Sequence, residues 1–94
     1  MSANDFLIKG QELLYARGLQ YGEPTANHLR IAQLWTAYLG RRIEPHEVAI
    51  CMLLVKVSRI SEQATHKDSY QDMVAYAAIA GHIATTDWDD LDAY

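Results

Sequence analysis

The sequence predicts an all-α fold, a compact bundle of about four helices with a central antiparallel helix hairpin. Apolar residues recur at spacings of one and three, as in Ile31, Leu34, Trp35 and Tyr38, which is typical of an amphipathic helix. Glycine and proline separate these periodic segments, and no convincing strand pattern stands among them. Short links between helices favour antiparallel neighbours, so we expect a small helical bundle.

The first helix is expected over residues 3–16, because apolar side chains recur along it at helical spacing. Asn4 is a plausible N-cap, and Gly18 is placed to end the helix in the left-handed conformation. Residues 18–25 hold two glycines and a proline, so we expect a loop there.

Three further helices complete the expected bundle. The second covers residues 26–39 and ends at Gly40, whereas the third begins at Pro45, a residue that suits a first helical turn. The third ends near residue 60, and the fourth runs over residues 67–84 after a short polar connection that His66 helps to end. Each boundary thus coincides with a residue that favours a helix start or stop.

The third helix holds the most apolar run of the chain, residues 48–55. Because this run is apolar on every side, we expect the helix to be central and covered on most faces. Cys51 within it is expected to be a buried thiol, and as the single cysteine it excludes an internal disulfide and a cysteine-based zinc site.

Length and composition indicate one small domain. The chain has 94 residues, half of them hydrophobic and 21% charged, which fits a packed globule. We expect a helical domain over residues 1–86 and an acidic tail over 87–94, which holds four of the 12 acidic residues. The remaining 8 acidic residues balance 8 basic ones, so the body has no electrostatic footprint for duplex nucleic acid.

The sequence also predicts where the protein works and how it is stabilised. No apolar run is long enough to span a membrane, and no signal peptide opens the chain, so we expect a cytoplasmic protein. A domain this short buries a modest share of its surface. Since the second and third helices are so apolar, we expect a homo-oligomer.

One group of charged residues stands out on the two apolar helices near the C-terminus. Asp68 and Asp72 are four residues apart and project from one side of a helix, with Tyr76 one turn further on. Antiparallel pairing of the third and fourth helices sets Lys56 level with Asp72, and Arg59 within a turn of Asp68. Two basic and two acidic side chains are therefore expected near the apolar centre.

This cluster has two interpretations. The charges satisfy one another as buried ion pairs, which is how proteins tolerate charge near an apolar interior. Alternatively, Lys56 and Arg59 hold the phosphate oxygens of a ligand, while Asp68 and Asp72 hold Mg²⁺, an ion that prefers oxygen ligands. A buried pair adds little stability, and this favours a site.

Residues near the start of the second helix extend the candidate site. Tyr21 precedes the helix, and Asn27, His28 and Arg30 lie in its first turns, where unpaired N–H groups suit an anion. Asn27 is otherwise a helix cap, and His28 is a candidate general acid/base or phosphate donor. Glu47 is either a carboxylate that compensates the helix dipole or a third metal ligand.

The order of these elements resembles a group of small bacteriophage proteins. The elements are Arg17-Gly18, Tyr21-Gly22, Asn27-His28, Arg30-Ile31-Ala32, Leu34-Trp35, Lys56-x-x-Arg59 and Asp68-Ser69-x-x-Asp72-x-x-x-Tyr76-Ala77. The Tyr-Gly, Lys-x-x-Arg and Asp-x-x-x-Asp-x-x-x-Tyr elements also resemble phage nucleotide-modification-associated helical domains. More distantly, the whole is similar to MazG-like all-α nucleotide pyrophosphohydrolases.

The resemblance implies a phage-encoded, oligomeric protein that handles nucleotides. MazG-like enzymes hydrolyse nucleoside triphosphates with Mg²⁺ held by acidic motifs on two helices. This chain departs from them, because Lys56-x-x-Arg59 stands where the family has Glu-x-x-Glu, and Asp68 and Asp72 stand at a different spacing from Glu-x-x-Asp. The exchange of acids for bases weakens metal binding and favours phosphate binding.

Three functions therefore remain open at the level of sequence. The first is a MazG-like pyrophosphohydrolase in which Lys56, Arg59 and His28 contact phosphates and Tyr76 or Tyr21 positions the ligand. The second is a non-enzymatic protein that sequesters a host or signalling nucleotide. The third is a structural or interaction protein whose charges only pair with one another.

Overall fold

Four α-helices account for most of the chain in the computed structural model, which describes residues 1–21 and 23–87, with residues 19–21 given by their backbone alone. The helices are α1 (Ala3–Tyr21), α2 (Pro24–Leu39), α3 (Pro45–Glu62) and α4 (Lys67–Ala84). The all-α prediction is confirmed. The expected acidic tail lies outside the described residues apart from Asp87, as does the side chain of Tyr21.

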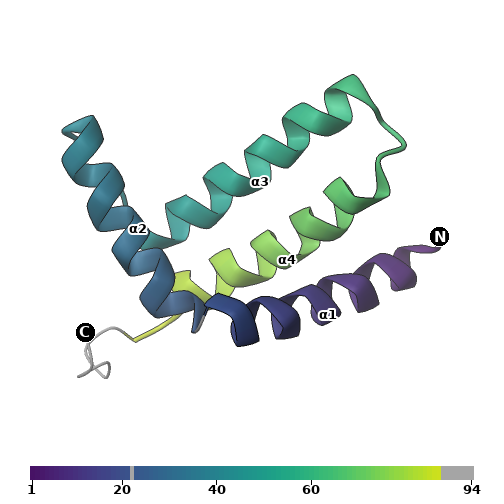
Figure 1. Cartoon of the computed structure of the whole chain (residues 1–94), viewed down its shortest axis with the longest axis horizontal. Coiled ribbons are helices and arrows are strands. Elements are labelled where there is room, and N and C mark those ends of the chain that lie inside the picture. The colour runs from purple at the N-terminus through teal and green to yellow at the C-terminus, as the bar shows by residue number, and fades with distance from the viewer. Residues whose placement is uncertain (22, 88–94) are drawn as a thin grey trace.

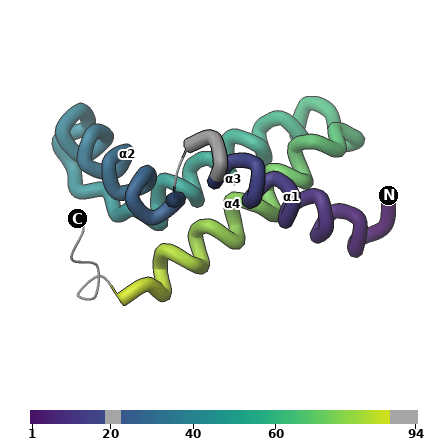
Figure 2. The backbone as a smooth tube through the Cα atoms, turned by 60° about the horizontal axis from the view of Figure 1, so that its bottom comes forward, coloured from purple at the N-terminus to yellow at the C-terminus, as the bar shows by residue number. Residues whose placement is uncertain are grey.

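The helices α3 and α4 form the expected antiparallel hairpin, joined by a short connection after Glu62. In Figure 1, α4 lies between α3 and α1, and α1 packs along α4 without reaching α3. The helix α2 packs mainly against α3 and crosses the end of this layer at which α1 finishes, as Figure 2 shows from another side. Parts of α1, α2, α3 and α4 therefore converge at that end.

The first helix is longer than the sequence predicted. It continues through Gly18 to Tyr21, because Gly18 keeps a helical conformation and Gly40 is the one described residue with a positive φ. Ser2 caps the helix in place of Asn4, since the Ser2 hydroxyl accepts a hydrogen bond from Asp5 N at 3.2 Å. The backbone N–H of Ser2 returns a hydrogen bond to the Asp5 carboxylate and lowers the pKa of that carboxyl below its ordinary value.

The prediction of a loop over residues 18–25 is also wrong, because α1 continues to Tyr21 and α2 already starts at Pro24. Its N-cap is Glu23, whose carboxylate accepts a hydrogen bond from Ala26 N at 3.0 Å, and Pro24 follows at the first helical position. Asn27 is therefore not the cap. The extension of both helices brings their adjoining ends close to α4.

The remaining boundaries follow the expected stop and start residues. Gly40 ends α2 in the left-handed conformation with φ 67°, and Pro45 opens α3. Glu44 and Glu47 form a capping box in which the Glu47 carboxylate accepts from Glu44 N at 2.9 Å. His66 caps α4, as predicted, by accepting a hydrogen bond from Ser69 N at 3.3 Å.

The interior is small, and α3 is not covered on most faces. Val48 and Ala49 are buried, whereas Cys51 is exposed, so its prediction as a buried thiol is wrong. Within the described part of the chain, α2 and α4 are the helices that contact α3, and its other side is exposed at Ile50, Leu54 and Val55. Gly10 allows α1 to approach α4 closely, because a Cβ there would lie 2.5 Å from Val74 Cγ1.

No helix in the described part of the chain combines the length and the apolar character needed to cross a membrane.

Candidate functional site

Asp72 is the centre of the charged cluster. Its Oδ2 lies 3.0 Å from Lys56 Nζ across the α3–α4 hairpin, as the antiparallel register predicted. Its Oδ1 accepts a hydrogen bond from Arg17 Nη2 of α1, also at 3.0 Å. All three side chains are largely shielded from water, with exposed fractions of 16% for Asp72, 13% for Lys56 and 29% for Arg17. One carboxylate therefore pairs with two cations and neutralises one of them, so the cluster has a net charge of +1.

The second predicted contact does not form. Arg59 and Asp68 are both exposed, and no ion pair joins them in the part of the chain that the structure describes. Three residues beyond Lys56, Arg59 has turned about 60° from the line that faces α4, so its head lies in solvent. The second base comes from Arg17, which the site prediction missed because the first helix was expected to end at residue 16. The sequence feature that could have indicated Arg17 is its spacing. It lies three residues after Leu14 and four after Leu13, on the same side of the helix as these apolar residues.

Arg17 makes a second contact to α4. Its guanidinium carbon lies 5.1 Å from the centre of the Tyr76 ring, a cation–π arrangement. Asp72 and Tyr76 are four residues apart on α4, so both reach the same guanidinium. Another nitrogen of the Arg17 guanidinium, Nη1, is buried and has no hydrogen-bond partner among the described residues. A buried N–H donor of a charged group costs free energy when it has no acceptor. Nη1 is therefore a position at which an acceptor atom of a ligand would be stabilising.

A pocket of about 370 Å³ opens beside Arg17, where the four helices converge. Its volume is within the range of roughly 300–1,000 Å³ of small-molecule sites. Its walls are mostly apolar, and they include two aromatic rings, one cation, one amide and one imidazole. The lining residues are Arg17, Pro24, Asn27, His28, Ile31, Trp35, Val48, Met52, Tyr76 and Ile79.

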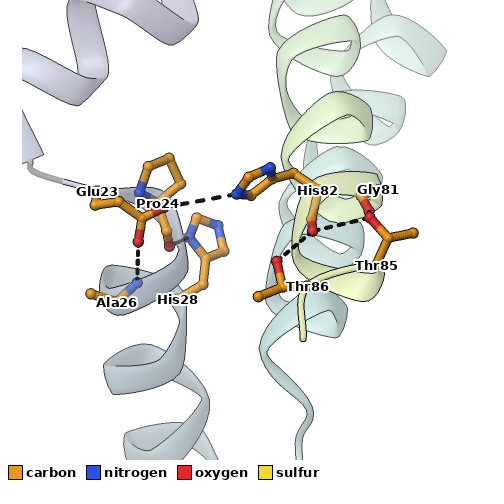
Figure 3. Close-up of polar contacts among 8 residues, drawn as sticks. All are labelled: Glu23, Pro24, Ala26, His28, Gly81, His82, Thr85 and Thr86. Atoms are coloured by element: carbon orange, nitrogen blue, oxygen red, sulfur yellow. Dashed lines mark hydrogen bonds and ion pairs between the residues drawn. The ribbon is translucent and has the colours of Figure 1, made fainter. Parts of the chain in front are cut away.

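His28 is buried in this wall, with 6% of its surface exposed. Its Nδ1 lies 2.8 Å from the Pro24 carbonyl oxygen, which can only accept, so Nδ1 is the donor (Figure 3). In the neutral ring, Nε2 is then an acceptor. Beside it, Glu23 caps α2 and approaches His82 of α4, with 4.0 Å between Oε1 and Nε2 (Figure 3). The His28 contact lies within α2, and the Glu23–His82 approach connects the start of α2 to α4.

The structure brings together part of the predicted site. Asn27, His28 and Tyr76 line the pocket. Lys56 does not line it and forms an ion pair with Asp72. The other predicted residues are elsewhere: Arg30, Arg59 and Asp68 are exposed, and Glu47 closes its capping box. Within residues 1–21 and 23–87, no three His, Cys, Asp or Glu side chains are grouped as a metal site requires. The magnesium site on Asp68, Asp72 and Glu47 stays a prediction.

The fold and the pocket define a small all-α protein whose charged cluster supports one wall of an open cavity. The chain belongs to the family described as Domain of unknown function (DUF6378), whose model matches residues 5–84. The match includes all of the pocket-lining residues.

The relatives of the chain are bacteriophage proteins. It is 39% identical over 74 residues to the Gene 55 protein of Mycobacterium phage L5, and 34% identical over 82 residues to the Gene 55 protein of Mycobacterium phage D29. The matches cover 78% and 86% of this chain but 44% and 54% of the relatives, so the chain spans about half their length. No solved structure matches it. The resemblance to small phage proteins is confirmed, whereas these matches lend no support to the MazG-like likeness.

Proposed function

We propose that the pocket binds a small anionic ligand with an aromatic ring, and that a nucleotide is the class that fits its walls best. The observation that carries the proposal is Arg17, which lines the pocket and whose buried Nη1 has no hydrogen-bond partner among the described residues. An anionic oxygen would complete the hydrogen bonding of this guanidinium. Charge-assisted hydrogen bonds of this kind are among the stronger ones in proteins.

The charge of the cluster favours an anion. Asp72 compensates one of its two cationic partners, so one positive charge remains unbalanced. Lys56 does not line the pocket, but its pairing with Asp72 Oδ2 leaves a single oxygen, Oδ1, for Arg17. Arg17 is therefore held in place and still has hydrogen-bonding capacity. We expect Lys56 to position Arg17 rather than to contact the ligand.

The apolar walls favour a ring. Trp35 from α2 and Tyr76 from α4 both line the pocket. Aromatic side chains can stack on any of the nucleobases. The Asn27 amide offers a donor and an acceptor, and Nε2 of neutral His28 offers an acceptor for an exocyclic amino or hydroxyl group. The pocket therefore combines a cation at one point with stacking surface and polar groups elsewhere.

The arrangement favours binding without hydrolysis over a pyrophosphohydrolase. Both oxygens of Asp72 are engaged by cations, and Glu47 is engaged by the backbone of its own helix. Asp68 is exposed on the first turn of α4. Mg²⁺ bound through Asp72 would have to displace a cation, which lowers the affinity expected for the metal.

A thermal-shift screen tests the proposal. The purified chain is heated with AMP, ATP, dTTP or cyclic di-GMP, each with and without Mg²⁺. A ligand at 100 times its dissociation constant stabilises the folded state by about 2.7 kcal/mol. For a domain of this size, that raises the melting temperature by roughly 10 °C or more. We expect a shift with at least one nucleotide that does not need Mg²⁺, and chromatography of the mixture should recover the nucleotide intact.

The control variants separate the pocket from general charge. Arg17→Met should abolish the shift, whereas Arg42→Met, which removes a surface arginine paired with Glu44, should preserve it. No shift with any of the nucleotides would contradict nucleotide binding. Recovery of pyrophosphate would instead favour the enzyme, with Mg²⁺ on the predicted carboxylates.

A further inference from the structure

The hydrogen-bonding capacity of His28 is set by its own helix. The ring is buried in the pocket wall, and its Nδ1–H is donated to the carbonyl oxygen of Pro24, four residues earlier, over 2.8 Å. A charged ring is costly to bury in a mostly apolar wall, so the neutral form is favoured. In that form the other nitrogen, Nε2, is an acceptor and has no hydrogen to donate.

Nε2 is unpaired and can be reached from the pocket. The hydrogen bond that His28 makes within the described part of the chain uses Nδ1 and leaves Nε2 without a partner. Arg17 Nη1 is the one fully buried side-chain nitrogen or oxygen without a partner among the described residues, so Nε2 retains some exposed surface. Figure 3 shows this nitrogen on the side of the ring that faces α4, which lines the pocket through Tyr76 and Ile79. A ligand in the pocket can therefore contact it.

Arg17 and His28 require opposite chemistry from such a ligand. The guanidinium of Arg17 can only donate hydrogen bonds, so it suits an anionic oxygen. Neutral His28 can only accept through Nε2, and two acceptors placed together leave both unpaired. The two side chains therefore suit different parts of one ligand. We expect His28 to face a part other than the phosphate, in contrast to the phosphate contact that the sequence indicated.

We propose that His28 determines the specificity of this pocket. Its Nε2 accepts a hydrogen bond from an N–H or O–H group of the ligand, and a ligand that presents an acceptor there is rejected. The inference rests on the proposed nucleotide binding and narrows the class of nucleotide. A site that hydrogen-bonds a donor of its ligand discriminates against the analogue without that donor, because the polar group of the site is then left unpaired. The aromatic walls cannot discriminate in this way, since they can stack on any base.

Two parts of a nucleotide can supply the hydrogen. The exocyclic amino group of adenine or cytosine donates, whereas the oxo group in the same position of hypoxanthine or uracil accepts. A ribose hydroxyl can also donate, and a deoxynucleotide lacks one of these hydroxyl groups. The rejected ligand is therefore an oxo base in the first case and a deoxynucleotide in the second.

Calorimetric titration of the full chain with matched nucleotides tests the inference, at pH 8 to favour neutral imidazole. AMP is compared with IMP, and CMP with UMP, because each pair differs by an amino and an oxo group. AMP is also compared with its 2′-deoxy and 3′-deoxy forms. We expect at least one of these changes to raise the dissociation constant about tenfold or more, as an unpaired buried acceptor implies. The change that does so identifies the base or the sugar as the donor.

Two histidine variants locate the group that makes the distinction. The quantity compared is the ratio of two dissociation constants for the same variant, so a smaller folded fraction weakens both equally and leaves the ratio unchanged. The ratio should fall to about one in His28→Leu. It should persist in His82→Leu, which removes an exposed histidine of α4 that does not line this pocket.

Three results would overturn the inference. Equal binding within every pair by the wild-type chain would do so and would leave nucleotide binding itself intact. A preference that His28→Leu retains would also do so, because another group would then recognise the ligand. A chain that binds none of these nucleotides would overturn it as well, and the thermal-shift screen then reports separately on nucleotide binding as such.

Discussion

Asp72 Oδ1 accepts a hydrogen bond from Arg17 while its Oδ2 pairs with Lys56, each over 3.0 Å. The carboxylate thereby joins three helices, because Arg17 comes from α1, Lys56 from α3 and Asp72 from α4. It also holds Arg17 against Tyr76 at the wall of the pocket. The stability of the fold and the shape of the pocket therefore depend on the same side chain.

Replacement of Asp72 is expected to destabilise the protein strongly. Asp72→Ala leaves two mostly buried cations without their shared partner, and such losses cost about 3–5 kcal/mol. Asp68→Ala is the matched control, one turn earlier on α4 and exposed. It removes a favourable charge from the first turn of the helix, worth up to about 1 kcal/mol. Urea unfolding of both variants measures the difference, and equal losses would show that the ion pairs add no stability.

Two glycines of α1 are expected to respond in opposite directions to the same change. Gly10→Ala would place a Cβ 2.5 Å from Val74 Cγ1 and 3.1 Å from Val74 Cβ, and overpacking of this kind costs about 1–3 kcal/mol. Gly18→Ala meets nothing within 4 Å, so the better helix former should stabilise the protein by about 0.5–1 kcal/mol. Thermal melts of the two variants check this. If Gly10→Ala also stabilised the fold, the close approach of α1 to α4 would be wrong.

The cap of α4 depends on a histidine side chain. His66 Nδ1 accepts a hydrogen bond from Ser69 N and lies 2.7 Å from Ser69 Oγ, inside a largely buried corner. His66→Ala should lower the free energy of unfolding by about 1 kcal/mol, as loss of an N-cap generally does. His66→Asn supplies another capping oxygen and should retain most of the stability. Chemical denaturation compares the two, and equal effects would contradict a capping role.

The sequence predicted the helices and the hairpin well because both depend on local signals. Gly40, Pro45 and His66 mark helix ends through their own conformational and hydrogen-bonding properties, and each functions as expected. The contact between Lys56 and Asp72 follows from the register of two consecutive helices, so it too was predictable. Gly18 was misleading because glycine permits a helix end without requiring one.

The rest of the site depends on how distant elements pack. Arg17 reaches Asp72 because α1 lies against α4, an arrangement that no local pattern specifies. Arg59 was expected in the cluster because the antiparallel register considers only the level of a residue along the helix, and it leaves out the turn of about 60° between Lys56 and Arg59. Cys51 was expected to be buried because an apolar run in the sequence does not show which side of its helix the other helices leave exposed.

Fluorescence of Trp35 tests the central claim, that the pocket beside Arg17 binds a nucleotide, most directly. The chain has two tryptophans, Trp35 and Trp88, so a Trp88→Phe background isolates the one in the pocket wall. We expect ATP or another nucleotide that shifts the melting temperature to quench Trp35 saturably. Adding Arg17→Met should weaken the binding at least about tenfold, equivalent to 1.4 kcal/mol. Emission that does not change with nucleotide, or saturation at the same concentration without Arg17, would contradict the claim.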